Sequence, residues 1–86
     1  MNPYDVVLYP LISEKTVSMM ERENKLVFIV TRKASKNEIK GAVEKLYKVE
    51  VSDVSVLIQP DGKKRAFVKL REEYLADEVA TKMGVF

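Results

Sequence analysis

The sequence contains no cysteine and no histidine. Without cysteine the chain can form no disulfide and offers no thiol for catalysis. Zinc sites usually need cysteine or histidine, and histidine is the commonest general base, so most metal and acid–base mechanisms lose their usual residues. We therefore expect no catalytic residue, no metal and no cofactor, although a site made of carboxylates alone is chemically possible.

Long apolar runs are also missing, since the longest extends only from Leu26 to Val30. A membrane-spanning helix needs about 18 apolar residues or more. The opening Met-Asn-Pro-Tyr-Asp lacks the basic segment followed by an apolar one that is typical of a secretory signal. We expect a cytoplasmic protein that is not inserted into a membrane. The 86 residues, without a repeat or a linker, fit one domain over 1–86.

The net charge is only +2, but its distribution along the chain is uneven. Residues 32–71 carry eleven basic and five acidic side chains, a balance of +6. The two ends together carry four basic and eight acidic side chains, a balance of −4. A cationic middle between acidic ends favours a polyanionic partner, and the alternative is an ordinary solvated surface.

The first half of the chain predicts a strand, a helix and a second strand. The apolar run at 6–9 indicates a short strand that ends at Pro10, because proline cannot donate to a sheet ladder. Ser13 is a good N-cap for a helix over 14–23, and Asn24 favours its end. Residues 25–31 are apolar on both alternating faces, so this strand should lie centrally, with cover on both sides.

The second half begins with the clearest helix signal. Ser35 and Glu38 have the spacing of a capping box, in which each side chain bonds the other residue's backbone. An apolar stripe follows at helical spacing, made of Ile39, Ala42, Val43, Leu46 and Tyr47. Two alternating strands, 54–59 and 65–71, then flank a tight turn in which Gly62 can take a positive φ.

A last helix is predicted over 74–83, burying Leu75, Val79 and Met83 and ending at Gly84. The order along the chain is then strand, helix, strand, helix, hairpin, helix. This order is typical of a single small α/β (α+β) domain.

The strongest candidate binding feature is the run Lys63-Lys64-Arg65, which leads into Phe67 and Lys69. Cations at a hairpin tip can neutralise phosphates, and an aromatic ring between cations can stack on an unpaired base. The alternative is a charged outer strand that resists edge-to-edge aggregation, with Phe67 belonging to the core.

A second basic cluster comprises Arg32, Lys33, Lys36 and Lys40. Lys36 and Lys40 are four residues apart and share one helix face. The start of that helix offers free N–H groups to a phosphate, and the alternative is again a solvated helix face. Because both clusters flank the central strand, together they favour an RNA surface more than either does alone.

The run Ser13-Glu14-Lys15 could suggest an enzyme, since serine beside lysine is a known nucleophile pair. Ser13 is better explained as a helix cap, and Glu14 suits the positive end of the helix dipole. Glycines that would form an oxyanion hole do not accompany the pair. We therefore expect no enzyme activity and no small-molecule substrate.

Taken in order, these motifs resemble the twenty-third protein family of the large ribosomal subunit, a universal family. The matching segments are YPLISEK (9–15), ENKLVFIV (23–30), ASKNEIK (34–40), AVE (42–44) and VEV (49–51). The closing ATKMGVF (80–86) and the short hairpin resemble the archaeal branch. Bacterial members carry a long extension in place of this hairpin turn, which reaches into the exit tunnel. Ser55 stands where the family usually has asparagine, so a contact made by that amide would be weaker here.

The resemblance implies a four-stranded antiparallel sheet packed with helices, and binding to large-subunit ribosomal RNA beside the polypeptide exit. The rRNA contacts we expect are Lys15, Arg32, Lys33, Lys36, Lys40, Lys63, Lys64, Arg65 and Lys69. Neighbouring ribosomal proteins would be further partners.

The resemblance also implies a docking surface for factors that meet nascent chains. In bacteria the chaperone trigger factor docks through a glutamate that aligns with Glu14. In an archaeal-type chain the signal recognition particle and the protein-conducting channel are the expected partners of Ile12, Ser13 and Glu14. Two rival functions stay open at this point, namely a free RNA-binding module and a protein–protein adaptor that binds no RNA.

Overall fold

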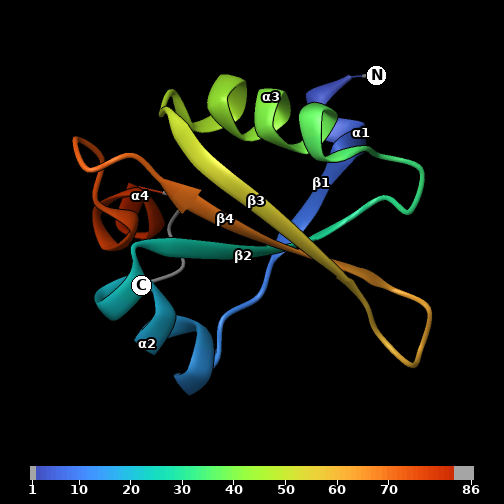
Figure 1. The fold of residues 1–86 in the computed structure, drawn as a ribbon, viewed down its shortest axis with the longest axis horizontal. Coiled ribbons are helices and arrows are strands. Elements are labelled where there is room, and N and C mark those ends of the chain that lie inside the picture. The colour runs from blue at the N-terminus through green and yellow to red at the C-terminus, as the bar shows by residue number, and fades with distance from the viewer. Residues whose placement is uncertain (1, 83–86) are drawn as a thin grey trace.

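The computed structural model describes residues 2–82, which form four strands and four helices in one small domain (Figure 1). The elements are α1 (Pro3–Val6), β1 (Val7–Pro10), α2 (Glu14–Glu23), β2 (Lys25–Val30), α3 (Lys36–Tyr47), β3 (Val51–Ile58), β4 (Lys64–Leu70) and α4 (Ala76–Lys82). The predicted fold class and element order are confirmed. The short α1 is an addition: the Asn2 side chain caps it by accepting from the Tyr4 N–H at 2.9 Å.

The four strands form one antiparallel sheet in the order β1-β2-β4-β3. β2 is internal and buried on both faces, as its apolar sequence predicted. The idea that the basic fourth strand is a protective outer strand is wrong, because β4 lies between β2 and β3. The edges are β1 and β3, so the cations of β4 have no edge to protect.

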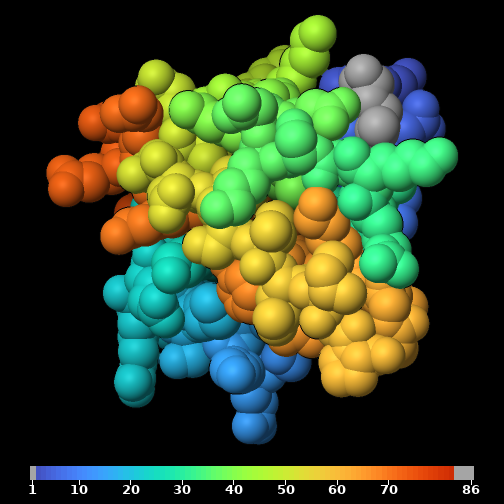
Figure 2. Space-filling model, turned by 45° about the vertical axis from the view of Figure 1, so that its right-hand side comes forward, coloured from blue at the N-terminus to red at the C-terminus, as the bar shows by residue number. Residues whose placement is uncertain are grey.

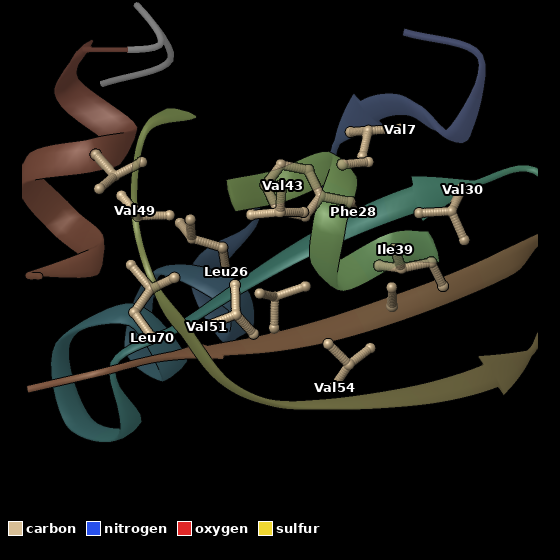
Figure 3. Close-up of a cluster of buried hydrophobic side chains, with 14 of the residues drawn as sticks. Val7, Leu26, Phe28, Val30, Ile39, Val43, Val49, Val51, Val54 and Leu70 are labelled. Atoms are coloured by element: carbon tan, nitrogen blue, oxygen red, sulfur yellow. The ribbon is translucent and has the colours of Figure 1, made fainter. Parts of the chain in front are cut away.

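One face of the sheet carries the main core, beneath α1 and α3 (Figure 3). Phe28, Ile39 and Leu70 are among its largest fully buried side chains. The ring of Tyr47 stacks on Phe28 with centroids 5.6 Å apart and planes inclined by 11°. The predicted apolar stripe of α3 therefore faces the sheet, with Leu46 and Tyr47 partly buried at its end.

The opposite face of the sheet is covered over only part of its width. α2 packs on β2 and contacts α4, and Val27 and Ile29 are buried on this side. Neighbouring residues of β4 and β3 on the same face are half-buried or exposed. We call this region the open half of the sheet, made of Arg65, Phe67 and Lys69 of β4 and Asp53, Ser55 and Leu57 of β3.

The ends of α2 lie where the sequence predicts them. Ser13 caps the helix as predicted, and its capping partner is Thr16, three residues on. The Ser13 N–H donates to Thr16 Oγ1 at 2.8 Å, and the Thr16 N–H donates to Ser13 Oγ at 3.3 Å. Asn24 ends the helix in the left-handed conformation, with φ of 56°.

The last helix begins later than predicted. The Asn24 side chain accepts from the Ala76 N–H at 2.7 Å, and α4 begins at Ala76. Leu75 therefore precedes the helix and is 50% exposed, so the prediction that it is buried is wrong. Val79 is buried as predicted, together with Ala76 and Ala80. Met83 and Gly84 lie outside the described residues.

Candidate nucleic-acid interface

The hairpin end of the sheet brings the two predicted basic clusters together. Val30 pairs with Lys64, so the chain leaves β2 beside the β3–β4 turn. Lys64 Nζ donates to the Ala34 carbonyl at 2.6 Å. The Arg32 side chain lies against the hairpin turn. One of its guanidinium nitrogens is 3.8 Å from the position that a Cβ on Gly62 would occupy.

We call this region the basic end, made of Arg32, Lys33, Lys63, Lys64 and Arg65. Figure 2 shows the hairpin, in yellow and orange, below the start of α3, in green. Residues about thirty positions apart in the sequence thus form one surface.

Among residues 2–82, the nine predicted RNA-contacting cations form no ion pair with an acidic side chain. Within residues 2–82 the only ion pair joins Lys25 to Glu23, at 3.2 Å. None of the nine therefore has a described carboxylate oxygen within 4.0 Å. The cations of the basic end, gathered at one end of a small domain, create a positive potential that attracts a polyanion.

The predicted cations occupy both sides of the sheet. Lys64 is turned towards α3, the helix that carries Lys36 and Lys40. Arg65 lies on the open half, and Lys15 faces it from α2. The two sides meet at the hairpin tip, so the surface wraps around the end of the sheet rather than covering one face.

Lys69 lies away from the other cations of β4. Its strand neighbours are Lys25 on β2 and Asp53 on β3, towards the opposite end of β4 from the hairpin. Ser55 is exposed beside Phe67 on the open half. The structure therefore separates Lys69 from the basic end, although it shares a face with Arg65.

Hydrogen bonds within the hairpin hold Arg65 in place. Arg65 Nε donates to Gln59 Oε1 at 2.8 Å, and Gln59 Nε2 donates to Asp61 Oδ1 at 3.1 Å. Asp61 also accepts from the Lys63 N–H at 3.1 Å, and this bond is the main cause of a lowered Asp61 pKa. Gly62 takes a positive φ of 92°, as predicted, which allows the tight turn.

Lys63 lies over the ring of Tyr9, a residue of the edge strand β1. Its Nζ is 6.0 Å from the ring centroid, at the limit of a cation–π contact. Interaction with the Tyr9 hydroxyl raises the pKa of Lys63. Lys63 is therefore fully charged at neutral pH and remains exposed to a partner.

A groove of about 150 Å³ lies between the start of α2 and β4. Its lining residues are Leu11, Ile12, Ser13, Lys15, Thr16, Met19, Arg65 and Phe67. Two predicted protein-docking residues thus share one groove with two predicted RNA-binding residues. Glu14, the third docking candidate, is exposed in the first turn of α2 and does not line the groove.

Residues 5–79 match the protein family described as ribosomal protein L23. The chain belongs to this family. Three relatives match over all 86 residues of both chains, each named large ribosomal subunit protein uL23. They come from Methanococcus aeolicus, Methanococcus vannielii and Methanococcus maripaludis, at 50%, 46% and 44% identity. The predicted archaeal-type resemblance is confirmed by these relatives.

Two absences hold for residues 2–82 of this L23-family chain. No helix there is long and apolar enough to cross a membrane. No group of three or more acidic, cysteine or histidine side chains in that range could hold a metal ion.

Sequence reasoning missed three contributors to this interface, namely Tyr9, Gln59 and Met19. Tyr9 and Gln59 lie beside predicted cations only after the sheet has formed. Met19 lines the groove although its helix was predicted correctly. Its position one residue before the buried Met20 is the signal that places it on the flank of the helix.

Proposed function

We propose that this protein is a structural constituent of the large ribosomal subunit in the cytoplasm, which binds large-subunit rRNA near the polypeptide exit and catalyses no reaction. Membership of the L23 family supports the ribosomal part of this proposal. The observation that carries the RNA part is the basic end, whose cations have no acidic partner among the described residues.

Binding would be largely electrostatic. Each lysine or arginine that neutralises a phosphate releases counterions from the RNA, so affinity falls as salt concentration rises. Because cations lie on both sides of the hairpin end, the protein can contact two RNA segments at once. This arrangement suits a protein that holds parts of a folded RNA together.

The start of α2 is proposed as the protein-docking region. Ile12 is 42% exposed, and Ser13 and Glu14 are exposed beside it. An exposed apolar side chain next to an acid is suited to a partner with an apolar and basic surface. The family resemblance supports the signal recognition particle and the protein-conducting channel as partners, with neighbouring ribosomal proteins covering other surfaces.

Co-sedimentation with ribosomes tests the proposal. The protein should stay with large subunits in stoichiometric amounts after a high-salt wash, because many contacts formed during assembly exchange slowly. Recovery in the soluble fraction would contradict the proposal and favour a free RNA-binding module. Association with subunits without any crosslink to rRNA would favour a protein–protein adaptor.

A further inference from the structure

The groove between α2 and β4 lies at the boundary of the part of the sheet that α2 covers. Phe67 forms part of its lining and is half-buried. On one side Phe67 pairs with Val27, which is buried beneath the helical cover. On the other side it pairs with Ser55, which is exposed. The aromatic side chain therefore stands at the boundary between the covered and the open parts of this face.

The size of the groove limits its occupant. Sites for drug-sized ligands enclose roughly 300–1,000 Å³. At about 150 Å³ the groove is smaller, so it suits a single planar group rather than a large ligand or a helix. Leu11, Met19 and Phe67 supply apolar and aromatic lining for such a group.

The polar groups of the groove are mainly donors. Lys15 and Arg65 are both cations, and none of the lining residues is acidic. Thr16 Oγ1 donates to the Ser13 carbonyl at 3.2 Å, and Ser13 Oγ accepts from the Thr16 N–H, so the Ser13 hydroxyl keeps its own proton to donate. A nucleotide supplies phosphate and base acceptors for these groups, whereas an apolar protein side chain would leave both cations without a partner.

We propose that this groove binds one unpaired nucleobase of the RNA, stacked on Phe67, with Lys15 and Arg65 meeting its flanking phosphates. Gln59 is a positioning residue, because its side-chain oxygen holds the Arg65 guanidinium. The inference rests on the proposed rRNA binding and adds a particular mode of recognition. Aromatic stacking of a base is not tied to its sequence, so the groove selects for an extruded nucleotide rather than for one base.

The test measures binding of the full chain to transcribed large-subunit rRNA across a salt series. Phe67→Leu should weaken binding by about 5- to 100-fold at every salt concentration, because base stacking is lost. The slope of log affinity against log salt should stay unchanged, because no phosphate contact is removed. Tyr4→Leu is the matched control, since Tyr4 is an aromatic 77% exposed on α1, and it should bind like the wild type.

A second variant distinguishes loss of base stacking from unfolding of Phe67→Leu. Met19→Trp fills the groove from α2 and leaves Phe67 in place, and it should cause a similar loss at unchanged slope. Chemical probing of the bound rRNA should show one unpaired nucleotide that is protected by the wild type and by Tyr4→Leu but exposed with both groove variants.

Unchanged affinity and unchanged protection in both groove variants would overturn the proposal. That result would favour an apolar side chain of a protein partner as the occupant of the groove. A changed salt slope in folded variants would also overturn it. If the wild type itself does not bind rRNA, the proposed function fails first, and that result is distinct from a failure of the groove alone.

Discussion

Asn24 joins two segments of the molecule that are far apart in the sequence. Its Nδ2 donates to the Tyr74 carbonyl at 2.8 Å, and its Oδ1 accepts from the Ala76 N–H at 2.7 Å. Its backbone also adopts the left-handed conformation that ends α2. Only the helix-ending role of Asn24 was predicted, because the signals that end a helix lie within a few residues. A side-chain hydrogen bond between residues fifty positions apart depends on the finished fold.

Replacing Asn24 by glycine separates these two roles. Asn24→Gly keeps the left-handed backbone but leaves the Ala76 N–H and the Tyr74 carbonyl without this partner, so we expect a loss of about 1–3 kcal/mol in the free energy of unfolding. Lys48 is the matched control, since it ends α3 with φ of 55°. Lys48→Gly should leave stability unchanged or raise it by up to about 1 kcal/mol. Urea denaturation measures both, and equal losses would contradict the assigned role of the Asn24 side chain.

Charge reversal at the basic end tests the electrostatic contribution of individual residues. Lys64→Glu with Arg65→Glu should weaken rRNA binding and lower the magnitude of the salt slope by about 2, one for each lost phosphate contact. Arg22→Glu with Lys48→Glu makes the same change in net charge outside the basic end and should leave the slope nearly unchanged. A filter-binding assay over a salt series provides the comparison, and the same slope in both double variants would rule out a localised phosphate-binding surface.

The helix α3 shows how far an element can be predicted from its own residues. Its capping box and its buried stripe were both predicted, because each depends on spacings within a few turns. The start of α4 was not predicted, because it is fixed by the side chain of Asn24, which lies at the end of α2. Likewise, the alternation of Ala66 and Val68 with Arg65 and Phe67 is local, whereas the position of β4 inside the sheet depends on pairing with distant strands.

The capping box of α3 should make stability depend on pH. The Ser35 N–H donates to the Glu38 carboxylate at 3.0 Å, and this bond is the main cause of a Glu38 pKa below its ordinary value of 4.5. A carboxyl whose pKa is lowered by folding stabilises the protein above its unfolded-state pKa, and this contribution is lost as pH falls through the lower folded-state value.

Glu38→Gln provides the comparison for this pH effect, because glutamine suits a capping box and cannot be protonated in this range. The wild type should have the higher melting temperature near neutral pH, and the difference should shrink as pH falls below about 4.5. Thermal denaturation followed by circular dichroism from pH 7 to pH 3 measures it. A difference that stays constant over this range would contradict the role of the ionised carboxylate.

At the scale of the whole molecule, the sheet separates a covered face from a partly open one. Helices α1 and α3 close one side, whereas α2 leaves the β4 and β3 part of the other side open (Figure 1). The candidates for RNA contact could be named from the sequence, because clusters of lysine and arginine are visible in it. It could not predict the groove, since Lys15 and Arg65 meet there only when α2 crosses the face of the sheet.

The most direct measurement is ultraviolet crosslinking of assembled large subunits, followed by mass spectrometry of the peptides bound to rRNA. We expect crosslinks within residues 32–36 and 63–67, and none on the acidic turn of α4 at Asp77 and Glu78. Crosslinks confined to α4, or a protein that enters the subunit without any crosslink to rRNA, would contradict the claim that the basic end is the RNA-binding surface.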